Sequence, residues 1–450
     1  MKRGQFSSRL AFILAASGSA VGLGNIWGFP SKAAENGGGA FLLMYLFLAF
    51  LLAYPALMAE LTLGRHGRSN MVSTLDSITS GLVQKRLGQL TGIMGVITAT
   101  MILCFYSIIA GWMMAHTLAS IMQTLKMYKI AEWLVTFSLW RNICFSTAFI
   151  SLTLLVISAG VEKGIEIWSK RLMPCMLLLL LGLIVYVLLQ PGAEEGLKIF
   201  LVPDFTQLAD PQLILSALGQ AFFSLSLGVG TMLIYGSYIR SDENLPVAGA
   251  LVTVSDTGVA VLAGMLIIPA LFAAQQLGVD IYTETGRLIS GPDLIFHALP
   301  ALFEGMGEAE ALVAIAFFTL MSIAALTSSI SMFEVPVSWA IETQKMSRLK
   351  ASIAVGVFTI LISGIISYKF TSIFEIVVVA TTEWAQPILS LMLCLFCGWL
   401  MHRNHLLDEL KQGVPDLESG LFWRIWPTYV KIFCPLLIVI ILVQSFLPFS

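Results

Sequence analysis

The chain has 450 residues, of which 57% are hydrophobic and only 12% are charged, and its net charge is −2. A soluble chain of this length carries about twice that charged fraction. Several apolar runs reach the roughly 20 residues that cross a bilayer, so the composition predicts an integral membrane protein with many spans. The small net charge and the lack of a basic arm make a nucleic-acid partner unexpected.

The apolar runs predict an all-α membrane protein with eleven transmembrane helices. Their approximate ranges are 9–32, 38–66, 87–122, 142–160, 164–190, 211–240, 245–274, 307–342, 348–367, 371–402 and 427–447. The stretch 275–305 is too polar to span and is predicted to be a structured external loop. We expect a single domain, 1–450, in which 9–190 and 211–402 each hold five helices and 427–447 is the last helix.

Lysine and arginine predict the orientation, because these residues favour the cytoplasmic side of a membrane. With the amino terminus inside, most of the 25 lysines and arginines fall on inner segments. We therefore expect a cytoplasmic amino terminus and, with an odd number of spans, a carboxyl terminus outside the cell membrane.

The first apolar run is interrupted at 17–30, which holds Gly18, Gly22, Gly24, Gly28 and Pro30. Glycine weakens a helix and lets it open locally. Open backbone at membrane depth is tolerated only where it lines a cavity or binds something. The expected occupants are an anionic group at the free N–H groups and a cation at the free carbonyls. The alternative is a glycine-rich helix-packing face.

A second interruption, rich in serine and glycine, lies at 222–230 in the sixth predicted helix. Two interrupted helices five spans apart predict a 5+5 inverted repeat with discontinuous helices 1 and 6. Five is odd, so the second half lies upside down relative to the first and the two breaks face each other near the midplane. This arrangement favours a transport site.

Oxygen-bearing side chains lie at membrane depth near these breaks. Asn25 and Asp256 carry hard oxygen ligands, and a buried carboxylate is costly unless it is paired or binds a cation. The hydroxyls of Thr327, Ser328 and Ser329 could bond to carbonyls of their own helix or help to hold a cation. Oxygen ligands without a Cys or His cluster favour an alkali cation.

Other buried polar groups have less certain partners. Tyr106 either packs in the core or contacts a ligand through its hydroxyl. Glu60 and Glu334 are expected to join a buried polar network. The chain contains no signature of a serine hydrolase, zinc protease or phosphate-binding loop, so we expect no enzyme activity.

The run A-V-G-L-G-N-I-W-G-F-P at 20–30, followed by A-A-E-N-G-G-G-A-F, closely resembles the signature of the neurotransmitter:sodium symporter family. Further matches cover nearly the whole chain and occur at Glu60, Gly64–Arg65, 106–112, 222–238, 324–330 and Glu342. The resemblance implies a sodium-coupled symporter that imports a small, apolar amino acid by alternating access, with two sodium ions. A proton-coupled or exchange carrier, or an amino-acid-sensing membrane protein without transport, is the alternative.

The resemblance also implies roles for individual residues. The first sodium site would be formed by Ala20, Asn25, Ser224 and Asp256. The second sodium site would be formed by Gly18, Val21, Ala324, Thr327 and Ser328. The substrate would meet Ser19, Ala20, Gly22, Gly24, Ile102, Tyr106, Phe223, Ser226, Val229, Ser328 and Met332. The inner gate would pair Arg3 with Glu342, near Phe6 and Tyr238.

Asp256 stands where the family often has asparagine, and its assignment in place of Ser255 rests on ungapped spacing from Ser224. A fixed carboxylate beside sodium can replace the chloride that animal members need, so we predict chloride independence. Val229 takes the place of a bulky aromatic residue, which could favour larger apolar amino acids, including aromatic ones.

The chain departs from the family at the outer gate. The family usually has arginine where Gly28 stands and an aspartate on helix 10, where the aligned position is about Val378. The usual outer ion pair is therefore not expected, and closure is assigned to Phe223, Trp27 and the loop 275–305.

Overall fold

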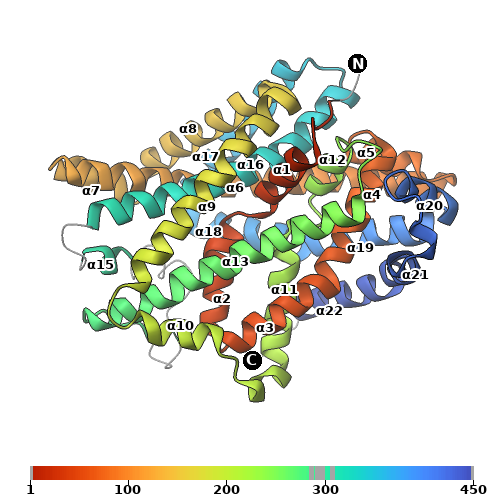
Figure 1. Ribbon diagram of the computed structural model, residues 1–450. Coiled ribbons are helices and arrows are strands. Elements are labelled where there is room, and N and C mark those ends of the chain that lie inside the picture. The colour runs from red at the N-terminus through yellow and green to blue at the C-terminus, as the bar shows by residue number, and fades with distance from the viewer. Residues whose placement is uncertain (1–3, 283–287, 289–298, 305–309, 447–450) are drawn as a thin grey trace.

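The computed structural model describes residues 4–282, 288, 299–304 and 310–446, which form an all-α bundle as predicted (Figure 1). In the first half of the chain the helices are α1 (Arg9–Ala20), η1 (Gly24–Gly28), α2 (Phe29–Glu35), α3 (Gly39–Leu48), η2 (Ala49–Ala53), α4 (Tyr54–Gly67), α5 (Met71–Ser77), α6 (Leu82–Thr124), α7 (Tyr128–Val135), α8 (Leu139–Ser158), η3 (Val161–Glu166), α9 (Ile167–Leu188), α10 (Ala193–Leu201) and η4 (Phe205–Ala209).

In the second half of the chain the helices are α11 (Pro211–Ser224), α12 (Thr231–Gly236), α13 (Leu245–Gln276), α15 (Leu299–Glu304), α16 (Glu310–Thr343), α17 (Arg348–Tyr368), α18 (Phe370–Val378), η7 (Val379–Ala385), α19 (Gln386–Leu395), η8 (Phe396–Leu400), α20 (Arg403–Lys411), η9 (Leu417–Ser419), α21 (Leu421–Thr428), η10 (Tyr429–Phe433) and α22 (Cys434–Phe446). Several of these elements join end to end into longer helices, such as α3–η2–α4 and α18–η7–α19–η8.

Within the described residues, nine helical stretches are long and apolar enough to cross a membrane. The bent pair Arg9–Ala20 and Gly24–Glu35 makes a tenth if it is counted as one span. The predicted span 211–240 is divided between α11 and α12, and neither piece is long enough alone. The predicted loop 275–305 lies largely outside the described residues, and α15 is its described helix.

Side-chain caps explain where several helices begin. The hydroxyl of Ser8 accepts a hydrogen bond from the N–H of Ala11 at the start of α1, and Asn244 accepts one from Val247 at the start of α13. Such caps satisfy backbone donors that have no partner within the helix.

The two interrupted helices lie inside the bundle, against its long continuous members. α1 packs on α9, α13 and α16, and α12 packs on α4 and α16. The contact between α4 and α12 is made by backbone, because a Cβ atom at Gly64 would lie 1.9 Å from the Leu233 carbonyl oxygen. Continuous helices therefore hold the broken ones in place on several sides.

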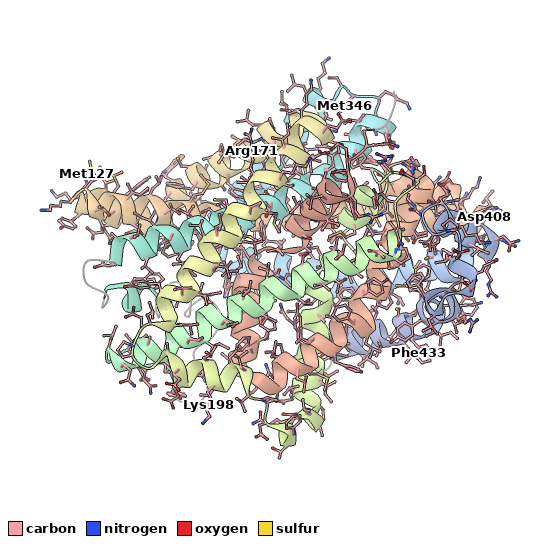
Figure 2. All side chains as sticks on the ribbon, in the orientation of Figure 1. Met127, Arg171, Lys198, Met346, Asp408 and Phe433 are labelled. Atoms are coloured by element: carbon pink, nitrogen blue, oxygen red, sulfur yellow. The ribbon has the colours of Figure 1, made fainter. Side chains whose placement is uncertain are left out.

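The short helices mark the two ends of the bundle. The amino terminus, α5 and α20 lie at one end, which we call the amino-terminal end, and α7, α10 and α15 lie near the opposite end (Figure 1). Figure 2 labels a residue at each end, Asp408 on α20 at the amino-terminal end and Lys198 on α10 near the opposite end.

A buried ion pair ties α20 to the rest of the bundle. Nε of Arg65 lies 2.6 Å from a carboxylate oxygen of Glu409, and a second guanidinium nitrogen donates to the Glu409 carbonyl. Burial alone would raise the pKa of Glu409, but the hydrogen bond from His66 and the Arg65 charge outweigh it and hold this pKa below its usual value. The carboxylate therefore stabilises the fold above its unfolded pKa, and this contribution is lost as the pH falls through the folded pKa.

We predict that Glu409→Gln lowers the free energy of unfolding by about 3–5 kcal/mol, because it leaves the buried Arg65 guanidinium without its counter-charge. The measurement is the melting temperature in detergent at neutral pH. Glu418→Gln is the matched control, since Glu418 forms an exposed ion pair with Lys411 and should change stability by less than about 1 kcal/mol. Equal melting temperatures for both variants would contradict the prediction.

Candidate functional site

The first interruption begins where α1 ends. The N–H of Val21 makes the last helical bond, to the Ser17 carbonyl at 2.7 Å, and Val21 itself is extended, with φ −69° and ψ 109°. The helix that follows, Gly24–Glu35, is bent by 56° from α1. Carbonyls near the end of α1 are thereby released, and the Ser328 hydroxyl donates to those of Ser19 and Val21 at 3.2 and 3.1 Å.

The second interruption lies between Ser224, the last residue of α11, and Thr231, the first of α12. Ser226, Gly228 and Gly230 have positive φ values of 51°, 85° and 80°. A Cβ atom at Gly228 would lie 2.1 Å from the Gln386 carbonyl oxygen, so only glycine fits there.

The predicted polar partner Glu60 holds this second break open. Its carboxylate is fully buried on α4 and accepts the N–H of Gly228 at 2.6 Å. A backbone donor that has left the helical ladder at membrane depth is thus satisfied by a carboxyl oxygen from a neighbouring helix.

Asn25, Ser224 and Asp256 converge between the two breaks. The Asn25 amide nitrogen donates to the Asp256 carboxylate at 2.7 Å and to the Ser224 hydroxyl at 2.9 Å, and Ser224 donates to the other Asp256 oxygen at 2.7 Å. Ser255 instead donates to the Leu251 carbonyl of its own helix at 2.8 Å. The structure therefore brings Asp256, and not Ser255, to this cluster.

The electrostatics of this cluster suit a cation. Asn25 and Asp256 are both 0% exposed, and the described donors to the carboxylate are neutral amide and hydroxyl groups. An ionised carboxylate in that setting is costly unless positive charge lies beside it. Tyr45, which the sequence analysis did not consider, donates its hydroxyl to Ser224 at 3.3 Å and adds a further oxygen.

A second group of oxygens lies where α1 meets α16. The Thr327 hydroxyl donates to the Ala324 carbonyl at 3.0 Å, and the Ser328 hydroxyl contacts the released Val21 carbonyl. A Cβ atom at Gly18 would lie 3.4 Å from Cβ of Thr327, so Gly18 belongs to the same group. All five residues expected at the second sodium site are thus neighbours.

The three consecutive hydroxyls of α16 therefore have different roles. Thr327 bonds to carbonyls of its own helix, and Ser328 crosses to α1. Ser329 pairs with the hydroxyl of Thr153 on α8 at 3.0 Å, away from the break. The described part of the chain holds no cluster of three His, Cys, Asp or Glu side chains that could bind a metal ion.

The predicted substrate residues surround the first break. The Leu23 N–H lies 3.5 Å from the Tyr106 hydroxyl, and the Ser19 hydroxyl donates to that of Ser331 at 2.6 Å. A Cβ atom at Gly22 would lie 2.5 Å from the Ser328 hydroxyl oxygen, so Gly22 is required by close approach. Three further predicted residues are buried apolar side chains, namely Ile102, Val229 and Met332.

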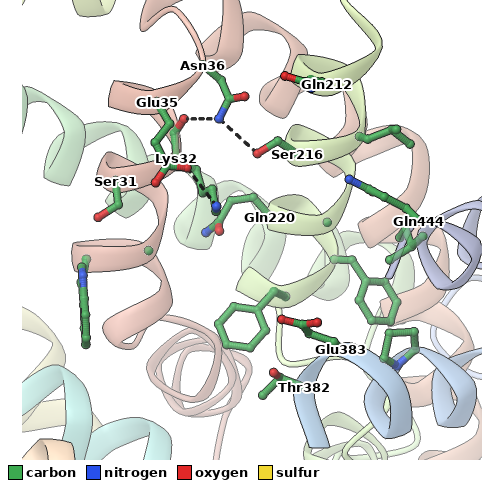
Figure 3. Close-up of a pocket in the computed structure, with 18 residues that line it drawn as sticks. Ser31, Lys32, Glu35, Asn36, Gln212, Ser216, Gln220, Thr382, Glu383 and Gln444 are labelled. Atoms are coloured by element: carbon green, nitrogen blue, oxygen red, sulfur yellow. Dashed lines mark hydrogen bonds and ion pairs between the residues drawn. The ribbon is translucent and has the colours of Figure 1, made fainter. Parts of the chain in front are cut away.

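A cavity of about 720 Å³, which we call the vestibule, lies beside Phe223 and reaches toward the end opposite the amino terminus. Its walls are α2, α11 and η7, with Lys32, Gln220 and Glu383 among the lining side chains (Figure 3). Phe223 is 41% exposed and its ring packs near Gly24. Glu383 of η7, five residues beyond the aligned position Val378, also lines the vestibule.

At the amino-terminal end, the segment before α1 packs against α12 and the turn that follows it. Phe6 is buried against Tyr235 and Tyr238, and its N–H donates to the Tyr238 carbonyl at 3.0 Å. The Tyr238 hydroxyl donates to Glu334 at 2.6 Å, and Arg348 binds the other oxygen of Glu334 at 2.5 Å. Glu334 thus joins a buried network, as expected.

The structure describes only one residue of the predicted inner gate pair, Glu342. Glu342 accepts hydrogen bonds from the backbone and side chain of Asn70 at 2.7 and 2.9 Å. Arg3 lies outside the described residues, so its pairing with Glu342 stays a prediction.

Two interrupted helices whose polar side chains meet at one buried carboxylate, beside an open cavity, are typical of a membrane carrier of the broken-helix class. The model of the sodium:neurotransmitter symporter family matches residues 3–137 and 138–450. The chain therefore belongs to this family, whose members are transporters and not enzymes.

Individual relatives agree with this assignment. The chain is 34% identical to the uncharacterized sodium-dependent transporter YhdH of Bacillus subtilis (strain 168), over 97% of this chain and 96% of that protein. It is 30% identical to the sodium- and chloride-dependent taurine transporter of Bos taurus, over 66% of this chain and 54% of that protein. The crystal structure of MhsT in complex with L-phenylalanine matches with a TM-score of 0.83 and 34% identity, over 99% of this chain and 100% of that chain.

We predict that Gly22→Ala weakens sodium binding at least tenfold, about 1.4 kcal/mol, because the added methyl group would displace Ser328 from the released carbonyls. The measurement is the rise in melting temperature with increasing sodium at constant ionic strength. Gly182→Ala on α9, where nothing lies within 4 Å of the new atom, is the control and should keep the full response. An unchanged sodium response in Gly22→Ala would contradict this placement.

Proposed function

We propose that this protein imports a small, apolar amino acid together with two sodium ions by alternating access, without a requirement for chloride. The observation that carries the proposal is the buried Asn25–Ser224–Asp256 cluster between the two interruptions. In this proposal the Asn25 amide turns its oxygen to the first sodium ion, beside Asp256, Ser224 and the Ala20 carbonyl. The second ion takes the oxygens of Gly18, Val21, Ala324, Thr327 and Ser328.

The substrate and the first sodium ion would bind cooperatively. The substrate carboxylate would take over the N–H of Gly22, which donates to Oδ1 of Asn25 at 3.1 Å in this structure. It would also meet the N–H groups near Gly24 and the Tyr106 hydroxyl, and it would complete the sodium shell. The ammonium group meets carbonyls near Ala20, Phe223 and Ser226. Opposite charges then accompany each other into a site where either alone would be costly.

Sodium would also provide the driving force. Each sodium ion that enters a cell at about −100 mV contributes roughly 2.3 kcal/mol. A tenfold gradient adds about 1.4 kcal/mol for each ion. Two ions therefore support steep accumulation of substrate, which explains why we propose two occupied sites and not one.

The substrate is proposed to carry a bulky apolar side chain. Ile102, Val229 and Met332 offer apolar surface with no charge, and valine at 229 leaves more room than an aromatic residue would. The related MhsT structure contains L-phenylalanine, which supports an aromatic or large aliphatic amino acid here.

We extend the proposal to the topology. α11 and α12 would together form one discontinuous span, which gives eleven spans with the nine long helices and the bent first helix. Two inverted units of five, 9–190 and 211–402, would then face each other, with the amino terminus in the cytoplasm and the carboxyl terminus outside. The vestibule would open to the outside and the amino-terminal end would face the cytoplasm.

The rival functions make different predictions for ions. A proton-coupled or exchange carrier would use Asp256 or Glu60 in place of a sodium site, and a sensor would bind amino acid without accumulating it. Purified protein in liposomes separates these possibilities. We expect uphill uptake of labelled L-phenylalanine or L-leucine with an inward sodium gradient, and at least tenfold less when choline replaces sodium. Full uptake in choline would favour the rival carrier.

We predict that replacing chloride by gluconate leaves uptake within about twofold, because the Asp256 carboxylate supplies the negative charge beside sodium. Asp256→Asn removes that charge and should lower the apparent affinity for sodium at least tenfold, with partial recovery when chloride is added. Ser255→Ala is the neighbouring control and should behave like the unchanged protein. Loss of uptake in gluconate would overturn the chloride part of the proposal alone.

A further inference from the structure

Three charged side chains line the vestibule among the described residues, namely Lys32, Glu35 and Glu383. Lys32 and Glu35 lie on α2, and Glu383 lies on η7 across the cavity (Figure 3). The other lining side chains are neutral, so the cavity has an excess of one negative charge. Among the described residues that line the vestibule, Lys32 is the single basic one.

Lys32 is held only weakly where it is. Its ammonium nitrogen lies 2.9 Å from Glu35, one turn along the same helix, and the two side chains are 49% and 28% exposed. Exposed pairs of this kind contribute about 0–1 kcal/mol. A lysine on a flexible four-carbon chain can therefore change partner at little cost.

Glu383 is in the opposite situation. In the open vestibule its carboxylate is exposed to water. Alternating access requires this cavity to close, and closure would remove that water. A carboxylate enclosed without a counter-charge costs several kcal/mol unless it takes up a proton, and a cation that accompanies Glu383 into the closed state removes that cost.

The residues near position 28 supply no positive charge for Glu383, so Lys32 is the candidate partner. Gly28 has no side chain, and the nearby Gln220 amide is neutral and donates to the Gly24 carbonyl at 2.9 Å. Lys32 lies four residues beyond Gly28, which places both on one face of the helix. Glu383 lies in a π-helical segment, and such segments are common at sites that change conformation.

We propose that Lys32 leaves Glu35 and binds Glu383 when the vestibule closes, so that this ion pair latches the outer side over the bound substrate. The inference rests on the proposed alternating access. The latch joins α2 to η7 about one helical turn, roughly 6 Å, outward of Gly28. The space above Phe223 is then left free of a gating side chain, which suits a bulky substrate.

Charge reversal tests the latch in liposomes that first show sodium-driven uptake by the unchanged protein. Lys32→Glu and Glu383→Lys should each reduce uptake at least tenfold, while sodium still raises their melting temperatures. The double variant, which restores opposite charges across the cavity, should recover at least half of the uptake. Lys198→Glu, an exposed reversal on α10 at the same end of the bundle, is the control and should transport normally.

Cross-linking provides a second measurement that does not depend on the rate of transport. Lys32→Cys with Glu383→Cys is made in a background with Cys144 and Cys175, the two exposed cysteines, replaced by serine. A short bifunctional thiol reagent should link the pair at least threefold faster with sodium and substrate than with sodium alone.

The outcomes separate the latch from the proposed function. Failure of the unchanged protein to transport would reject the function, whereas transport with an unrecovered double variant and a cross-linking rate independent of substrate would overturn the latch. Loss of uptake with Glu383→Lys but not with Lys32→Glu would also overturn it, since Glu383 would then act on a free cation.

Discussion

The buried Asp256 carboxylate is the constraint on which the rest of the site depends. A carboxylate at membrane depth needs hydrogen-bond donors or a cation, and the side chains that reach it are an amide and a hydroxyl from two interrupted helices. Those interruptions expose peptide groups that also need partners. The cluster around Asp256 forms only where the two breaks meet, and the helices α4, α13 and α16 hold them in that position.

The parts of the structure that depend on local sequence were predictable. Glycines in the first apolar run and the serine–glycine stretch near 226 predicted both breaks, because glycine tolerates the positive φ values and the close contacts found at Gly22 and Gly228. Apolar length predicted the long helices to within a few residues. Spacing in the sequence did not decide whether Ser255 or Asp256 lies beside Asn25. The direction in which each side chain leaves α13 decides it in favour of Asp256.

The pairs that depend on tertiary packing could not be predicted. Arg65 and Glu409 are far apart in the sequence, and nothing local links them. The Tyr238–Glu334–Arg348 network joins α16 and α17 to the turn that follows α12. The place of Glu383 beside α2 and α11 also depends on how the helices pack, because these segments are far apart in the sequence. The short helices α7, α10 and α20 lack the apolar length that identified the others.

Charged side chains are buried and paired at the amino-terminal end of the bundle but exposed to water in the vestibule. This difference matters for the proposed conformational change. At the amino-terminal end the Glu334 carboxylate is buried and paired, so separating the helices there requires ionic contacts to be broken or hydrated. In the open vestibule Glu383 is exposed to water and Lys32 pairs with Glu35 on its own helix. In the proposed alternating access, closing this end would exchange water for an ion pair, and opening the amino-terminal end would exchange ion pairs for water. These costs would partly offset each other, so the ions and substrate bound between the breaks would bias which state is populated.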